Sequence, residues 1–203
     1  MLRNRYNKCR LSLIALLCAS PLAVAQQPAP APLLESGHIQ LNGHSTLYQI
    51  HRLPISSYPE LPAPIATQLT LRGCMIPQTY AAHHPENVIH ASLESPGTSD
   101  WAVLCEANGT VSLLVFLSSA TDPVQLASAP ATSRLQLHDL TGVLGFNWGI
   151  DPATPDEVHQ AQAALPHHPP SLDHDALADS TVEGRTLYRF YSKSAWTLLP
   201  TPE

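Results

Sequence analysis

The sequence predicts a single α+β domain in which a mainly antiparallel sheet carries two short helices and one disulfide. Two Asn-Gly pairs, Asn42-Gly43 and Asn108-Gly109, each separate two β-rich runs, which is the pattern of a tight β-hairpin. Two shorter stretches show helical spacing or a helix-start pattern. With 44% apolar and 13% charged residues, the 203-residue chain has the composition of a globular protein and a length suited to one ordinary domain.

Residues 1–25 have the pattern of a secretory signal peptide. Four of the ten Lys and Arg residues lie in the first ten positions, an apolar stretch follows, and Ala23-Val24-Ala25 places small residues at a cleavage site. Pro21 ends the apolar stretch too soon for it to span a membrane. We therefore expect an exported bacterial protein, periplasmic or secreted, with no membrane span once the signal peptide is removed.

Removal of this leader makes the chain strongly acidic. The 10 Lys and Arg residues less the four in the leader leave 6 to face 16 Asp and Glu residues, so the mature net charge is about −10. A chain of this charge lacks the basic footprint that DNA or RNA binding needs, so no nucleic acid is expected as a partner. The charge favours a basic partner and an association that weakens with salt.

The mature chain is expected to begin with a linker, followed by a hairpin. Residues 26–35 are rich in Pro and Ala and suit a flexible linker, and the single α+β domain then spans residues 36–203. His38 to Leu53 alternates in polarity around Asn42-Gly43, which predicts two strands joined by a tight turn.

A short helix is expected from about Leu61 to Arg72, with Gly73 at its C-terminal cap. Cys74 and Cys105 are the two cysteines that remain after the leader, and an even count in an oxidising compartment favours a disulfide. It would close a loop of 32 residues and stabilise the fold by roughly 3–4 kcal/mol. The alternative is a free thiol nucleophile, which would need a His partner and a lowered pKa.

The clearest β region runs from Asn87 to Ser119. Ala102 to Cys105 and Val111 to Phe116 are nearly continuous apolar runs on either side of Asn108-Gly109. Because a strand that is apolar on both faces is covered on both faces, we expect this hairpin to lie inside the domain.

The C-terminal half contains weaker signals. Residues 124–144 are mixed in pattern, with a strand near Leu135. Thr followed by Pro and then by Glu predicts a helix that starts at Thr154 and runs to about Leu165. A last hairpin is expected from Arg185 to Ser192 and from Ala195 to Leu199.

An acidic segment near the C-terminus is a candidate metal site. Asp173, Asp175 and Asp179 group hard oxygen ligands of the kind that Ca²⁺ binds, although the central Gly and the spacing of an EF-hand are missing. The alternative is a solvated acidic loop that caps the last hairpin.

Histidines form two clusters that could bind Zn²⁺ or copper through neutral imidazoles. Neither cluster matches a metalloenzyme motif, and the alternative is a set of exposed surface histidines. The first cluster is His83, His84 and His90, and the second is His167, His168 and His174.

Other catalytic patterns are absent from the sequence, which has neither a Gly-x-Ser-x-Gly elbow nor a Gly-rich phosphate loop. Aromatic side chains could line a binding face, or fill the core as a domain of this size requires. These are Trp101, Trp148, Trp196, Tyr188, Phe190 and Tyr191.

Several short motifs resemble those of an uncharacterised family of small secreted bacterial proteins. The family carries Gly-Cys-x-Ile-Pro-Gln, Asn-Val-Ile and Asp-x-Ala-Val-Leu-Cys, and the matching segments here are Gly73–Gln78, Asn87–Ile89 and Asp100–Cys105. The likeness covers roughly residues 55–199 and implies architecture and export, without an activity. Residues 87–117 also resemble one hairpin of an FG-GAP propeller blade that lacks the Asp-rich calcium loop.

These patterns favour an exported, non-enzymatic domain that binds an envelope protein or an extracellular ligand. One alternative is a metal-dependent hydrolase that uses Zn or Ca at the His/Asp-rich segment 167–179 and would lose activity in chelator. The other is a structural envelope protein. Apart from these metals, the sequence predicts no cofactor.

Overall fold

The computed structural model describes residues 31–118, 120–138, 142–167 and 169–202. The expected signal peptide over residues 1–25 lies outside the described residues, as does the first half of the expected linker. The elements in chain order are β1 Leu33–Leu41, β2 His44–Pro54, η1 Ile55–Ser57, α1 Ala63–Leu71, β3 Met75–Gln78, β4 Val88–Ala91, β5 Asp100–Ala107, β6 Thr110–Phe116, β7 Val124–Pro130, η2 Ala131–Arg134, β8 Leu135–Leu137, β9 Leu144–Phe146, β10 Trp148–Ala153, α2 Pro155–Ala161, β11 Ala176–Thr181, β12 Thr186–Ser192 and β13 Ala195–Leu198.

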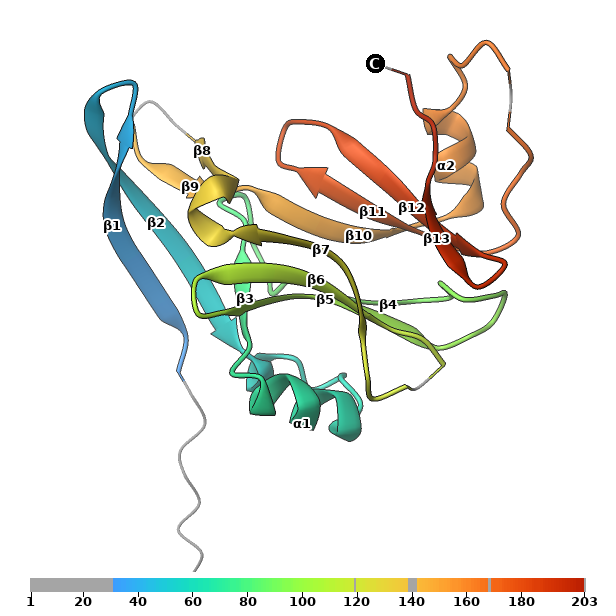
Figure 1. Ribbon diagram of the computed structural model, residues 1–203, viewed down its shortest axis with the longest axis horizontal. Helices are drawn as coiled ribbons and strands as arrows, with labels where there is room; N and C mark the ends of the chain where they lie inside the picture. The colour runs from blue at the N-terminus through green and yellow to red at the C-terminus, as the bar shows by residue number, and fades with distance from the viewer. Residues whose placement is uncertain (1–30, 119, 139–141, 168, 203) are drawn as a thin grey trace, which may run out of the picture.

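The strands form two sheets that pack against each other (Figure 1). The larger sheet runs in the order β7-β6-β5-β3-β2-β9-β8, with β1 beside β2 and β4 beside β5, and the smaller sheet runs β10-β11-β12-β13. Each strand pair is antiparallel except β2 with β9. The predicted α+β class, with a mainly antiparallel arrangement and two short α-helices, is confirmed.

Two-residue turns fix the register of three hairpins. Both residues have positive φ, between 50° and 81°, in each of the turns Asn42-Gly43, Asn108-Gly109 and Lys193-Ser194. Such turns match the right-handed twist of the strands, and Asn and Gly adopt this backbone at little cost. All three predicted hairpins are present, and the third uses Lys-Ser where Asn-Gly would fit with less strain.

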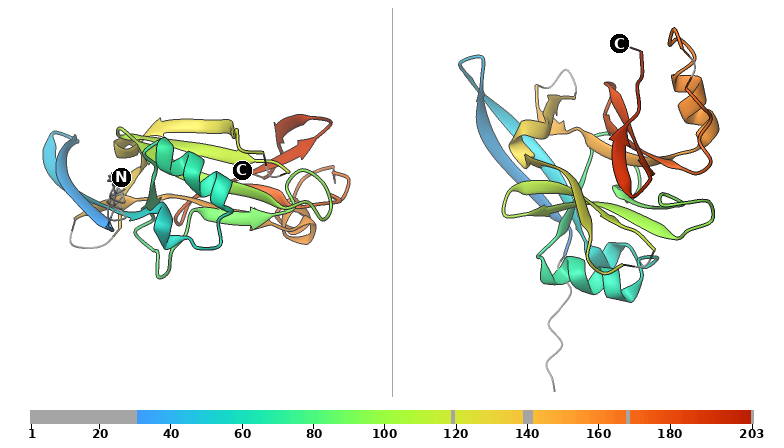
Figure 2. Two further views of the ribbon diagram at one scale, coloured as in Figure 1. Left: turned by 90° about the horizontal axis from the view of Figure 1, so that it is seen from below. Right: turned by 45° about the vertical axis from the view of Figure 1, so that its right-hand side comes forward.

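Helix α1 covers one face of the larger sheet, as the left view of Figure 2 shows. It buries Ile65 and Leu69 against that sheet and is followed by Gly73, whose φ of +73° ends the helix. Cys74 comes next and forms the predicted disulfide with Cys105 of β5, with a Cα–Cα distance of 5.1 Å. The disulfide therefore ties the end of α1 to the middle of the larger sheet.

The β5–β6 hairpin is buried on both faces, as its apolar runs predict. Leu104 and Leu113 lie on one face and pack with Trp148 in the core between the two sheets. Val103 and Phe116 lie on the other face and pack in the core beneath α1. The hairpin is thus the middle layer of the molecule.

Asn87 connects the two sheets through its side-chain amide. Its Nδ2 donates to the carbonyls of Pro77 (2.7 Å) and Trp148 (3.3 Å), and its Oδ1 accepts the N–H of Ile150 (3.0 Å). The residue is 1% exposed and has a φ of +67°. A short amide side chain that tolerates this backbone is therefore used to join β3 to β10.

Other residues of the quoted motifs also have structural partners. The N–H of Glu86 donates to the side-chain oxygen of Gln78 (3.0 Å), which fixes the loop after β3. Asp100 is fully buried and accepts the N–H groups of Leu93 (2.8 Å) and Ser118 (2.7 Å). Buried polar groups of this kind are retained because they satisfy backbone donors in loops.

The first strand begins earlier than the sequence analysis predicts. The expected linker ended at residue 35, but β1 starts at Leu33, because Leu33 and Leu34 pair with Arg52 and His51 of β2. The Pro/Ala composition of the preceding residues gives no sign of this pairing, which the long second strand of the same hairpin imposes.

The smaller sheet also contains strands that the sequence analysis does not predict. The segment treated as an acidic loop contains β11, which lies between β10 and β12. Three of its six residues, Ala176, Ala178 and Asp179, are weak in β propensity, so its two neighbours rather than intrinsic preference make it a strand. Helix α2 has the predicted capping box at Thr154 and Glu157 but ends at Ala161, before the expected Leu165.

We predict that Asn87→Ala lowers the free energy of unfolding by about 3 kcal/mol or more, because three buried backbone groups lose their partner. Asn87→Gly loses the same hydrogen bonds but relieves the strain of the positive φ, so it should be about 1 kcal/mol less destabilised. Denaturant titration measures both values. Wild-type stability in the Ala variant would contradict a joining role for Asn87.

We predict that replacing Cys74 and Cys105 together with Ala lowers the free energy of unfolding by about 3–4 kcal/mol, because the disulfide restricts a long loop in the unfolded chain. Denaturant titration of the oxidised protein and of the double variant measures the difference. Reduced wild type is the control and should fall to the stability of the variant. Equal stability with and without the disulfide would contradict the prediction.

Candidate functional site

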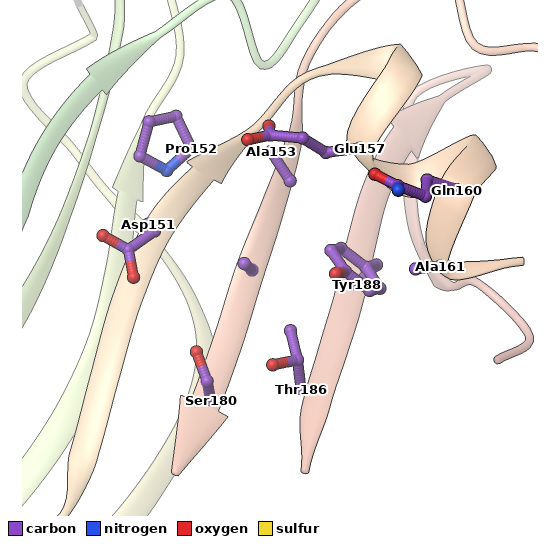
Figure 3. A pocket seen from close by; sticks show the side chains of 10 residues that line it. Asp151, Pro152, Ala153, Glu157, Gln160, Ala161, Ser180, Thr186 and Tyr188 are labelled. Atoms are coloured by element: carbon purple, nitrogen blue, oxygen red, sulfur yellow. The ribbon is translucent and has the colours of Figure 1, made fainter. Parts of the chain in front are cut away.

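The outer face of the smaller sheet carries a groove whose floor is β11, the strand between β10 and β12. Alternation along β11 turns Leu177 and Asp179 inward and leaves Ala176, Ala178 and Ser180 on the opposite face. All three side chains are small, so they rise less above the sheet than the side chains of β10 and β12 on either side. The residues that line the deeper part of this groove are shown in Figure 3.

Taller side chains on the flanking strands form the two sides of the groove. Asp151 of β10 lies opposite Ala178 on one side, and Tyr188 of β12 lies opposite Ala178 on the other. Thr186 pairs with Ser180 one step further along. Figure 3 shows the Asp151 and Tyr188 side chains on separate strands with the floor between them.

Helix α2 closes one end of the groove. Val158 is fully buried in a small core with Ala176 and Phe190, and this contact holds the helix against the sheet. Glu157 and Gln160 then line the groove from the helix side (Figure 3). Burial of Val158 therefore sets the position of α2, and Glu157 and Gln160 of the same helix lie at the surface of the groove.

The groove has two connected parts. The part beside Asp151 has a volume of about 470 Å³, and the adjoining part, which Arg185 and the C-terminal residues Thr201 and Pro202 line, has about 650 Å³. Both parts are lined by Ala161, Thr186 and Tyr188, so Tyr188 lies where they meet. Together they are large enough for a ligand of several groups.

The first part is acidic. Asp151 and Glu157 both line it, and within the described part of the chain no Lys, Arg or His does so. The capping box fixes Glu157, because its Oε2 accepts the N–H of Thr154 (2.7 Å) and the Thr154 Oγ1 accepts the N–H of Glu157 (3.3 Å). The Thr154 hydroxyl also donates to the Glu157 Oε2 (2.8 Å). The hydrogen bonds that the carboxylate accepts from the Thr154 N–H and hydroxyl lower the pKa of Glu157, so its carboxylate stays charged.

Asp151 is in a different electrostatic environment. Desolvation in the groove and the negative charges of Glu86 and Glu157 raise its pKa, while His84 acts in the opposite direction. Among the described residues, no hydrogen bond or ion pair reaches its carboxylate. Asp151 is nevertheless exposed at the groove surface, so its desolvation is only partial. A carboxylate beside other negative charges is a candidate position for binding a cation.

The three aspartates proposed as metal ligands have separate partners. Asp173 Oδ1 contacts His174 Nδ1 (2.6 Å), and Asp175 accepts the N–H of Ser92 (3.1 Å). Asp179 accepts the indole N–H of Trp148 (2.6 Å) and also pairs with Arg189 (2.6 Å). Across the described residues, no group of three or more His, Cys, Asp or Glu side chains is arranged to hold a metal ion.

The histidine clusters are not brought together either. His83 and His84 are exposed, and His90 is exposed and stacks on Trp101. His167 is exposed, and His168 lies outside the described residues. His174 differs from the expected surface histidines because it is buried, stacks on Phe190 and contacts the carbonyl of Tyr191 at 3.0 Å.

The sequence analysis missed Asp151 as a site residue and interpreted Glu157 only as part of a helix start. Of the six aromatic residues, three are buried and one, Tyr188, lines the groove. The buried ones are Trp101, Trp148 and Phe190, and the remaining two, Tyr191 and Trp196, are partly buried with their ring centroids 5.4 Å apart. The alternation of small residues in β11 is a possible signal. It cannot be used without knowing that β10 and β12 flank this strand.

No protein-family model, curated protein or solved structure matches the chain. The resemblances to a family of small secreted proteins and to the FG-GAP hairpin therefore stay predictions. Within the described ranges, no helix has the length and apolar character needed to cross a membrane.

We predict that Asp151→Asn raises the melting temperature at neutral pH. The raised pKa means that folding disfavours the charged form, so the gain should disappear as pH falls through this pKa towards the ordinary value of 3.8, where Asp151 becomes neutral in both states. Thermal melts of both proteins across this pH range measure the effect. The control is Asp156→Asn in the first turn of α2, a nearby carboxylate outside the groove lining, which should give no gain. A destabilised Asp151→Asn would contradict the prediction.

Proposed function

We propose that the protein is an exported binding domain of the bacterial envelope, and that its groove takes a ligand with a cationic group. The observation that supports this most directly is the pair of carboxylates, Asp151 and Glu157, at one end of the groove, in the part that no Lys, Arg or His of the described residues lines. A bound amine or guanidinium would supply the missing charge and stabilise the charged form of Asp151.

Tyr188 adds a second means of recognising a cation. Its ring lies beside the acidic part of the groove, opposite Asp151 across β11. A cation over an aromatic face gains about 0.5–2 kcal/mol, depending on how far it is desolvated. Carboxylates on one side and an aromatic ring on the other therefore favour Lys or Arg over a neutral group.

The rest of the lining suits an extended, polar ligand. Ser180, Thr186 and Gln160 offer hydroxyl and amide groups that can donate or accept hydrogen bonds along the groove. Arg185 lies in the second part, beyond Tyr188, and could bind an acidic group. We infer that the ligand is a peptide segment with a basic side chain, presented by an envelope protein or an extracellular partner.

We predict that a Lys-containing hexapeptide binds the protein and that its Lys-acetylated form binds at least tenfold more weakly, because acetylation removes the charge. Asp151→Asn and Tyr188→Leu should each weaken binding of the unmodified peptide by about tenfold or more. Binding should also weaken as salt rises, and as pH falls through the raised pKa of Asp151. Isothermal titration calorimetry measures each affinity.

The matched control is Asp156→Asn, which removes a carboxylate from the start of α2, close in sequence to Asp151 but outside the groove lining. It should retain wild-type affinity apart from a small long-range charge effect. If Asp151→Asn and Asp156→Asn bind the peptide equally well, the groove is not the site. If acetylation has no effect, recognition of a cation is wrong.

A further inference from the structure

Strand β1 is a free edge of the larger sheet. One side of β2 pairs with β1 along nine residues, and the other side pairs with β3 and β9, which lie end to end. In the described part of the chain, β1 has no strand on its outer side. Figures 1 and 2 show the β1–β2 hairpin at the margin of the molecule, at the end away from α2.

Other edges of the two sheets carry features that oppose further pairing. β7 has a register irregularity and ends at Pro130, β10 contains Pro152, and β8 and β13 have three and four residues. Short strands, prolines and bulges are the usual means of protecting an edge. β1 has nine residues in regular register and contains neither Pro nor Lys.

The single carboxylate on β1 is engaged inside the hairpin. The Glu35 carboxylate accepts a hydrogen bond from Tyr48 (2.8 Å) and forms an ion pair with Arg52 (2.6 Å). Both partners lower the pKa of Glu35, so its charge is held within the hairpin. Glu35 therefore opposes pairing with another strand less than a free charge on an edge strand would.

The two-residue turn determines which backbone groups of β1 point outward. In such a hairpin the residues next to the turn, Leu41 and His44, form a hydrogen-bonded pair, and pairs then alternate along the ladder. The odd-numbered residues of β1 thus bond to β2. The outward N–H and C=O groups belong to Leu34, Ser36, His38 and Gln40.

We propose that β1 pairs antiparallel with β1 of a second copy of this chain, with the two-fold axis at Gly37. This register aligns all nine residues, and it places Leu33 opposite the partner's Leu41 and Glu35 opposite the partner's Ile39. The outward-facing Ser36 then faces the partner's His38, so four residues of each strand form about eight backbone hydrogen bonds. No like charges lie opposite each other.

The side chains along β1 fit this arrangement. Leu33, Leu34 and Leu41 are 51%, 48% and 42% exposed in the single chain, and pairing covers them. Gly37 lets the two backbones meet closely at the axis, while the Tyr48 ring covers it from one side, within 2.7 Å of where a Cβ would lie. An aromatic ring over a strand glycine is a known compensation for the missing side chain.

The test is the mass in solution of the purified wild-type chain and of two variants at His38, measured by sedimentation over a range of concentrations. His38→Pro removes an outward N–H that β2 does not use, so it should give a folded monomer whose melting temperature no longer depends on protein concentration. His38→Ala keeps that N–H and should remain a dimer. A monomeric wild type at every concentration, or a dimer that survives His38→Pro, would overturn the proposal.

A cysteine pair checks the register. With the two-fold axis at Gly37, Leu33→Cys and Leu41→Cys in one chain should form two disulfides between copies, because positions 33 and 41 face each other as a close, non-hydrogen-bonded pair. A Leu33→Cys chain alone should not cross-link. Failure of the double variant to cross-link under oxidation would exclude this register. Peptide binding should be unchanged in His38→Pro, so this test does not depend on the groove.

Discussion

Burial of the β5–β6 hairpin on both faces is the constraint on which the rest of the structure depends. Because both faces are apolar, something must cover each of them, and the chain supplies α1 on one side and the smaller sheet on the other. Cys105 lies in this hairpin, so the disulfide to Cys74 fixes α1 to the middle layer. Asn87 then fixes the opposite layer through its bonds to the carbonyls of Pro77 and Trp148.

Buried charges are used to hold these layers in place. Arg52 bonds to Glu106 of β5 (2.7 Å) and thereby connects β2 to the middle layer, while Arg189 pairs with Asp179 next to Trp148. Buried ion pairs add little net stability but strongly disfavour arrangements in which one member is left alone. Of the three aspartates that look available for a metal in the sequence, Asp179 is engaged in a contact of this kind, while Asp175 accepts a backbone N–H and Asp173 is exposed beside His174.

The two surfaces proposed for interactions lie outside the two large apolar cores on either side of the β5–β6 hairpin. The groove is on the outer face of the smaller sheet, where small side chains on β11 leave space. Within the described part of the chain, no hydrogen bond or ion pair engages the Asp151 carboxylate beside it. The outer edge of β1 lies at the other end of the molecule. An assembly of two chains through β1 would leave both grooves open, so dimer formation and ligand binding are compatible.

Local chemistry in the sequence determined two of the hairpin turns, the start of α2 and the central buried hairpin, because Asn-Gly pairs, a capping box and apolar runs act within a few residues. The disulfide followed from a count of two cysteines. Only the tertiary structure showed that residues 176–181 form a strand and that a groove lies over it. The outward-facing residues of this strand are small, and it lies between β10 and β12 because of pairing that the local sequence does not reveal. It alone separated Asp151 from Asp173, Asp175 and Asp179, because a carboxylate's role depends on which donors the fold places beside it.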